Sequence, residues 1–142
     1  MRNFREIINK GIDMIYPESL YCICCGNIVD KTRSYSLCDH CNGHIRWAEA
    51  KTCKKCGKLL EESYENELCT NCLENQHLFE KGFTCSEYGL YQRTVTFNFK
   101  YNGKTYISRD MAKAMNDRMA LEDVIFDYVV PVPMFKDKEN RR

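Results

Sequence analysis

Two stretches of the sequence decide how this chain folds. Residues 22–41 read CICCGNIVDKTRSYSLCDHC, and residues 53–72 read CKKCGKLLEESYENELCTNC. Each stretch has a C-x₂-C pair, then twelve residues that begin with glycine, and then a second C-x₂-C pair. The eight cysteines repeat with a shift of 31 positions, from 22 to 53, 25 to 56, 38 to 69 and 41 to 72. A fixed period of this size indicates one small structural unit that is used twice.

The spacing within each unit predicts a metal site. Two cysteines three positions apart can direct both sulfurs to one side of a tight turn, and two such turns facing each other form a tetrahedral cage of the kind that Zn²⁺ prefers. Four thiolates leave no open coordination position, so each cage is predicted to be structural. The sequence therefore predicts two structural zinc ions, held by Cys22, Cys25, Cys38, Cys41, Cys53, Cys56, Cys69 and Cys72. The twelve-residue link is long enough for a short β-hairpin between the turns.

Ten cysteines in 142 residues need an explanation in either metal or disulfides. The N-terminal residues lack the apolar core of a signal peptide, so we expect a cytoplasmic protein whose thiols stay reduced. No stretch approaches the length of a transmembrane helix, and no membrane insertion is expected. A disulfide framework and an iron–sulfur centre are the alternatives to zinc. Interleaved pairing of the two units is the alternative to tandem pairing, which the repeat favours.

The remaining candidate ligands fall outside the pattern. Cys24 corresponds to Lys55 in the second unit, and Cys85 has no partner at ligand spacing, so both are interpreted as non-ligand thiols. His40 would break the repeat if it were a ligand, and Trp47, between the units, is expected to pack.

The flanking segments predict further elements. Residues 2–15 carry apolar side chains at helical spacing and predict an amphipathic helix that docks on the ribbons or on a second domain, with membrane association as the alternative. Residues 94–101 alternate between apolar and polar and predict a half-buried strand, which Asn102-Gly103 would end. Ser108 is a suitable N-cap for a following helix. Residues 124–133, VIFDYVVPVP, predict a buried parallel strand.

The order of these segments resembles the ComF family of competence-associated proteins. The resemblance rests on the N-terminal helix, Tyr16-Pro17, the doubled C-x₂-C-G units, FKYNG at 99–103 and FDYVVPVP at 126–133. It implies a double zinc ribbon followed by a type I phosphoribosyltransferase-like domain. It also implies a helix across Leu90–Lys100, against the strand that the alternation predicts.

The expected fold class is therefore small zinc-stabilised β ribbons, with tandem four-cysteine sites, followed by an incomplete α/β phosphoribosyltransferase-like domain. The expected divisions are an N-terminal amphipathic helix at 1–18, a double zinc ribbon at 19–80 and the start of the second domain at 81–142. The family's loop for phosphoribosyl pyrophosphate is not among these 142 residues. We therefore expect no catalytic residue here, a truncated domain that is inert as given, and phosphoribosyl pyrophosphate binding only in intact relatives.

Three functions follow as hypotheses. The resemblance implies a role in DNA uptake, with single-stranded DNA or competence machinery as partners. A free-standing zinc-ribbon module that binds nucleic acid or protein is the alternative, because basic residues gather at the second unit: Arg46, Lys51, Lys54, Lys55 and Lys58, with Trp47 beside them. The net charge of only +1 makes that electrostatic footprint weak. A nonfunctional remnant is the third hypothesis.

Overall fold

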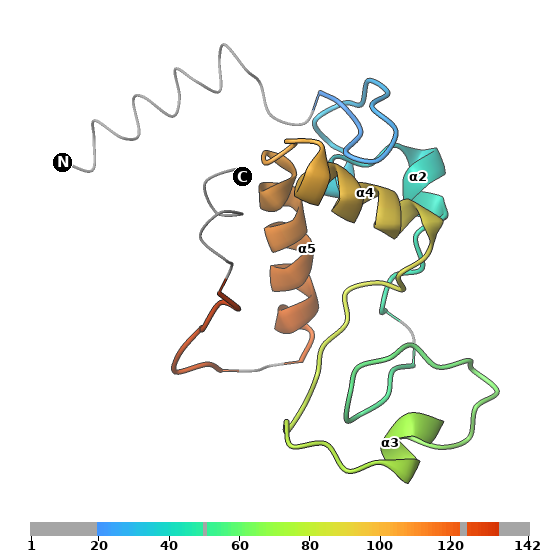
Figure 1. Cartoon of the computed structure of the whole chain (residues 1–142). Coiled ribbons are helices and arrows are strands. Elements are labelled where there is room, and N and C mark those ends of the chain that lie inside the picture. The colour runs from blue at the N-terminus through green and yellow to red at the C-terminus, as the bar shows by residue number, and fades with distance from the viewer. Residues whose placement is uncertain (1–19, 50, 123–124, 134–142) are drawn as a thin grey trace.

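The computed structural model describes residues 20–49, 51–122 and 125–133 (Figure 1). The predicted N-terminal helix at residues 2–15 lies outside the described residues. Within them the elements, in chain order, are the 3₁₀ turn η1 (Ser34–Ser36) and the helices α2 (Asp39–Gly43), α3 (Thr70–Glu74), α4 (Leu90–Tyr101) and α5 (Ile107–Ala120).

The sequence repeat is also a repeat of backbone structure. In the first unit Cys22 N–H donates to Asn27 O at 2.7 Å and Gly26 N–H donates to Cys22 O at 2.8 Å. The second unit has the same two bonds, 31 positions on, at 2.8 and 2.9 Å. The helices α2 and α3 begin at matching positions too, directly after Cys38 and Cys69. The two units therefore share one fold.

The predicted hairpin between the C-x₂-C turns is wrong. Instead, isolated β-bridges pair Tyr21 with Ile28 and Thr52 with Leu59, so they close the first turn of each unit. In the first link the backbone turns at Asp30, whose carboxylate accepts from Thr32 N–H at 2.8 Å. Such a side-chain bond favours a turn over an extended pair of strands. The described residues hold no β-strand longer than these bridges, so helices and irregular turns dominate the fold.

The main hydrophobic core joins the first unit to α4 and α5. Val95 of α4 and Ile107 at the start of α5 are almost completely buried against this unit. The first unit contributes Cys22, Ile23, Cys24, Val29, Leu37, Cys41 and Ile45. Residues on both sides of the predicted 80/81 division therefore share one core, and the division itself stays a prediction.

The strand predicted at residues 94–101 is wrong, and the helix implied by the resemblance is correct. Val95 and Asn98 are the buried residues of α4, and they lie three positions apart, which is one turn of helix. Asn98 donates from Nδ2 to the carbonyls of Ile23 and Cys24, each at 3.3 Å. The helix is thus selected by contacts with the first unit. Sequence alternation alone does not contain that information.

The boundaries of α5 also correct the sequence prediction. The helix begins at Ile107, and Tyr106 rather than Ser108 occupies the N-cap position, without a side-chain cap. Burial of Ile107 in the core fixes this start. The expected end of the preceding element is confirmed, since α4 ends at Tyr101 and Gly103 adopts a φ of 65°.

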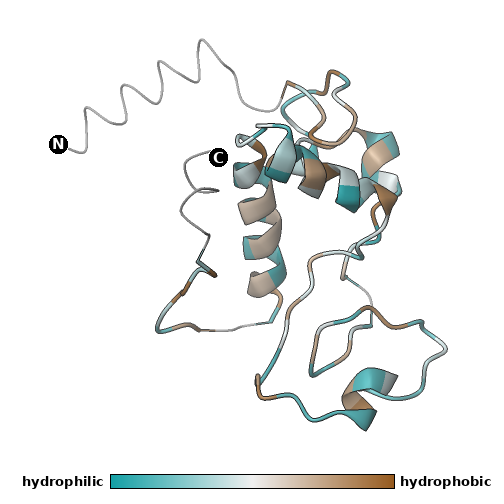
Figure 2. Cartoon of the chain, in the orientation of Figure 1, coloured by the Kyte–Doolittle hydropathy of each residue, from teal (hydrophilic) through white to brown (hydrophobic). Residues whose placement is uncertain are grey.

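The buried strand predicted at residues 124–133 is wrong for this chain. Residues 125–133 form no strand, and Val129, Val130 and Val132 are 85–90 % exposed. Figure 2 shows hydrophobic residues along this segment, which lies outside the helical core. A parallel strand needs neighbours on both edges, and the described residues supply none.

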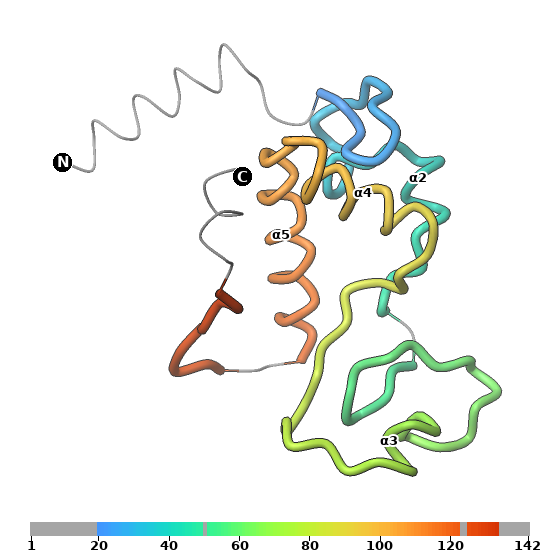
Figure 3. Tube along the Cα trace, viewed as in Figure 1, coloured from blue at the N-terminus to red at the C-terminus, as the bar shows by residue number. Residues whose placement is uncertain are grey.

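The second unit stands apart from this core. Its own small core consists of Cys53, Leu60 and Cys69, with Tyr64 and Leu68 packed against it. The chain leaves the first unit at Arg46–Ala48 and returns antiparallel at Cys85–Glu87, joined by the bonds Ala48 N–H to Cys85 O and Glu87 N–H to Arg46 O (Figure 3). We call these six residues the connector. The second unit is therefore an insertion in the chain between the two halves of the connector.

Candidate metal centres

The structure brings the eight predicted cysteines into two groups of four. Cys22, Cys25, Cys38 and Cys41 form one group, and Cys53, Cys56, Cys69 and Cys72 form the other. Within each group the sulfurs lie within 4.8 Å of one another. The pairing is therefore tandem, with one site in each unit.

The sulfur spacing fits zinc. A tetrahedral ion with Zn–S bonds of about 2.3 Å has sulfur–sulfur edges of about 3.8 Å. The Cys25 and Cys38 sulfurs are 3.8 Å apart, and those of Cys56 and Cys69 are 3.7 Å apart. A disulfide would require about 2.05 Å, and all ten cysteines are free thiols. Each cage thus has the size of a tetrahedral zinc site.

Backbone amides around each cage favour thiolates. Cys38 N–H points at the Cys22 sulfur at 3.4 Å, and Cys69 N–H points at the Cys53 sulfur at 3.2 Å. The tight turn after each first cysteine supplies further N–H groups. Such bonds stabilise the negative charge that a zinc ligand carries.

The thiol pKa values reflect this arrangement. Burial raises the pKa of Cys53, but the N–H groups of Cys56, Cys69 and Lys55 outweigh it and bring the pKa from 9.0 down to about 6. Cys22 behaves in the same way, since burial is outweighed by amides and its pKa falls to about 7.

The last cysteine of each cage shows the opposite shift. Burial, and then the neighbouring thiols of its cage, raise the pKa of Cys41. The same causes raise the pKa of Cys72 to about 12. Four crowded thiols therefore ionise together only when a cation neutralises them, which is the role that zinc fills.

The amide arrangement also depends on glycine in the second unit. Gly57 has a φ of 73°, and a Cβ atom built there would lie 2.5 Å from Gly82 O. Its counterpart Gly26 has a φ of 82° but nothing within 4 Å of such an atom. Only the second turn therefore requires glycine for close backbone approach as well as for its conformation.

The two units differ at the positions that decide what each one contacts. In the first unit Ile23 is buried under α4, and the Ser36 hydroxyl donates to Asp110 of α5 at 2.8 Å. Their counterparts in the second unit are Lys54 and Glu67, which are exposed and form an ion pair with each other. The first turn is thus built to dock on helices, and the second to face water.

The cysteines outside the cages have structural surroundings. Cys24 is buried, with its sulfur 3.7 Å from Tyr91 O, and burial raises its pKa. Cys85 is half-buried, and burial raises its pKa as well. Neither belongs to a four-sulfur group, as predicted.

His40, His44 and Trp47 also lie outside the two groups of cage cysteines. His40 contacts the Tyr91 hydroxyl at 3.1 Å, and its ring lies tilted beside that of His44, with ring centroids 4.5 Å apart. Trp47 packs on Tyr35, with ring centroids 5.0 Å apart, which confirms its packing role. The sequence argument missed the docking residues Ile23 and Asn98. For Ile23 a signal exists, because the repeat places an apolar residue opposite Lys54.

The basic residues predicted as a phosphate-binding group are largely engaged within the chain. Arg46 pairs with Glu61 at 3.1 Å and with Glu87 at 3.2 Å, and Lys54 pairs with Glu67. Lys51 donates to a backbone carbonyl, and Lys55 lies over a phenylalanine ring. Exposed pairs of this kind are weak and exchange readily, so they lower the local positive charge without locking these side chains.

Comparison with known proteins supports the zinc assignment. Residues 11–73 match the family model of the double zinc ribbon domain. No curated protein and no solved structure matches the chain. None of the described helices is both long and apolar enough to cross a bilayer. The cage geometry and the family match agree that this part of the chain is a double zinc ribbon with two tetracysteine sites for two structural zinc ions.

Proposed function

We propose that the chain is a ComF-like zinc-binding protein of the DNA-uptake type, in which the double zinc ribbon carries the first elements of a phosphoribosyltransferase-like domain. The observation that supports this most is the docking of α4 on the first ribbon. This helix contains the start of the FKYNG segment of the resemblance, and its Asn98 holds the carbonyls of the C-x₂-C turn. All eight cage cysteines act as zinc ligands in this proposal.

The exposed segment 125–133 also supports it. Its β-branched residues suit a strand in a sheet, yet they face solvent in the described structure. A phosphoribosyltransferase-like sheet is the neighbour that such a segment needs. These 142 residues contain no loop for phosphoribosyl pyrophosphate, so the chain alone is expected to be inert.

Calorimetric titration with phosphoribosyl pyrophosphate and Mg²⁺ tests the inert state. We expect no heat of binding for the zinc-loaded chain. Saturable binding would contradict the proposal. A ComF-family protein that contains a phosphoribosyl pyrophosphate loop is the positive control.

A second candidate is supported by the separation of the second ribbon from the helical core. Lys54 and Lys58 of this ribbon are exposed, and Lys51 and Lys55 are half-buried beside them. Such a surface suits transient contact with single-stranded DNA, in which phosphates displace the glutamate partners. A free-standing module that binds nucleic acid through this ribbon is therefore the alternative function.

Fluorescence anisotropy with a labelled oligothymidylate tests this alternative. The alternative predicts binding at low salt that weakens steeply as salt rises. It also predicts that Lys54→Glu/Lys55→Glu abolishes binding, whereas Lys31→Glu plus Lys113→Glu, the same charge change elsewhere, leaves most of it. Absence of binding at low salt rules out this alternative.

A further inference from the structure

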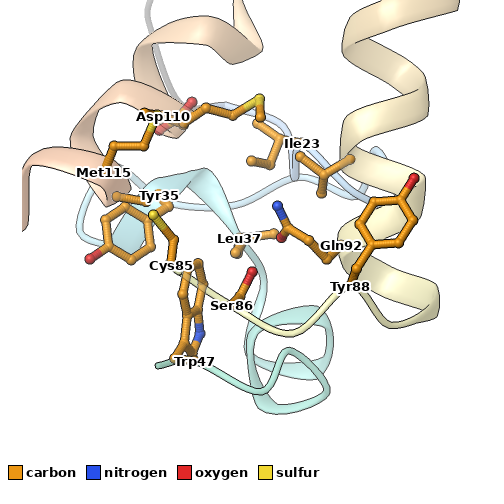
Figure 4. Close-up of a pocket in the computed structure, with 13 residues that line it drawn as sticks. Ile23, Tyr35, Leu37, Trp47, Cys85, Ser86, Tyr88, Gln92, Asp110 and Met115 are labelled. Atoms are coloured by element: carbon orange, nitrogen blue, oxygen red, sulfur yellow. The ribbon is translucent and has the colours of Figure 1, made fainter. Parts of the chain in front are cut away.

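A cavity of about 270 Å³ lies between the first ribbon, the connector, α4 and α5 (Figure 4). Ile23, Trp47, Val95 and Met111 are among its lining residues, and most of the lining is apolar. Cavities of about 150 Å³ hold one benzene-sized group. This cavity therefore has room for about two large apolar side chains.

Within the part of the chain that the structure describes, apolar side chains at the rim of the cavity are exposed. Met115 of α5 is 58 % exposed and Tyr88 is 67 % exposed. Met111, Met115 and Met119 are spaced four residues apart, so they share one face of α5. Unbranched methionine side chains adapt their shape to a partner, which makes such a face suitable for receiving another helix.

The same chain contains a segment with a matching pattern. Phe4, Ile7, Ile8, Ile12 and Ile15 recur at helical spacing within residues 2–15, the pattern of a helix that buries one face. The segment joins the described part at Leu20, whose carbonyl accepts from Val29 N–H in the first ribbon. Ile23, three residues further, already lines the cavity.

The short stretch of chain between residues 2–15 and Ile23 favours this segment over other possible occupants of the cavity. Ile15 and Ile23 are eight positions apart and so at most about 28 Å apart, which holds residues 2–15 near the cavity at high effective concentration. The other apolar segment of the chain, 125–133, is described and exposed, so it does not fill the cavity.

We propose that residues 2–15 dock as a helix over this cavity, with Ile8 and its apolar neighbours against Met111, Met115 and Trp47. The docked helix covers Cys85, the half-buried thiol in the cavity wall. This docking is an intramolecular contact and does not depend on either candidate function.

Two reporters in the cavity allow a direct test in the full-length protein. Trp47 is the one tryptophan of the chain, so its fluorescence and its quenching by acrylamide report on cover over the cavity. The alkylation rate of Cys85, followed by peptide mass spectrometry, is the second reporter, because the cage thiols are protected by zinc. A zinc content of two per chain verifies that each variant has folded.

The test uses two pairs of variants with matched charge. We expect Ile8→Asp and Met115→Asp each to increase the alkylation rate of Cys85 about tenfold and to increase quenching of Trp47. The controls Asn9→Asp and Asn116→Asp add the same charge one position away and should change neither reporter.

The double variant decides whether the two side chains meet. Because either single change already undocks the helix, Ile8→Asp/Met115→Asp should expose Cys85 no more than one change alone. Additive effects, or no effect of Ile8→Asp, would overturn the proposal. A dependence of Cys85 protection on protein concentration would overturn it as well, since it assigns the occupant to a second copy.

Discussion

Loss of one ligand from the second ribbon should unfold that ribbon and leave the rest of the molecule intact. Cys69→Ser removes a sulfur from the second cage and leaves the first cage untouched. The second ribbon buries few apolar side chains, with Leu60 the only fully buried aliphatic one among its described residues. Burial of one such side chain contributes about 1.5–3 kcal/mol. A structural zinc contributes about 10 kcal/mol or more.

Metal binding therefore dominates the stability of this ribbon. We expect the zinc content to fall from two to about one per chain. Amide protection in residues 51–74 should fall at least about 10³-fold, which corresponds to about 4 kcal/mol. Amides of α4 and α5 should keep their protection, because their core lies with the first ribbon.

Hydrogen exchange read by mass spectrometry, together with zinc determination, checks this prediction. Cys85→Ser is the matched control, since Cys85 belongs to neither cage, and it should retain two zinc ions. Loss of protection in α4 and α5 on Cys69→Ser would refute the reasoning, because it would show that the ribbons unfold as one unit. Retention of two zinc ions would refute the assignment of Cys69.

Three further predictions concern the turns and the pH dependence. Gly57→Ala should destabilise the second ribbon by more than about 1 kcal/mol and clearly more than Gly26→Ala destabilises the first, because Gly57, unlike Gly26, lacks room for a Cβ atom. Zinc transfer to a chelator measures both effects. Ile23→Lys, which introduces the residue of the second repeat, should lower the free energy of unfolding by about 3 kcal/mol or more, seen as a lower urea midpoint of the helical circular dichroism. Zinc affinity should fall as pH falls, because the folded-state pKa values of Cys22 and Cys53, about 7 and about 6, lie below 9.0 and their thiolates are lost as pH drops through those values. Chelator competition between about pH 8 and about pH 5 checks this sign, and a flat profile would contradict it.

The sequence predicted the metal sites well because cysteine spacing is a local property. The turn geometry, the shift of 31 positions and the tetrahedral grouping all follow from residues close together in the chain. The fold of residues 94–101 could not be predicted in this way. The alternation of apolar and polar residues there suits a strand, but contacts of Asn98 with backbone carbonyls 74 and 75 positions away select a helix.

The exposed segment 125–133 shows a second limit of sequence reasoning. Its composition correctly identifies a segment suited to a sheet, but burial depends on neighbours that the described residues do not supply. By contrast, the sequence contains enough information to predict which of the two ribbons docks on the helices. Comparing the two repeats position by position places Ile23 and Ser36 opposite Lys54 and Glu67, and apolar or neutral residues at matched turn positions indicate a buried turn.

The connector makes the second ribbon a removable part of the architecture. Ala48 and Cys85 are joined by one backbone hydrogen bond of 2.9 Å, so the chain departs and comes back at a single place. A turn of a few residues would be enough to close the main body there without disturbing the first zinc cage, at the expense of the bond from Arg118 of α5 to Thr84 O and the ion pair of Lys81 with Glu122. The second ribbon can therefore be lost, exchanged or altered at its surface without rebuilding the core, while the first ribbon is tied to the helices on which it rests.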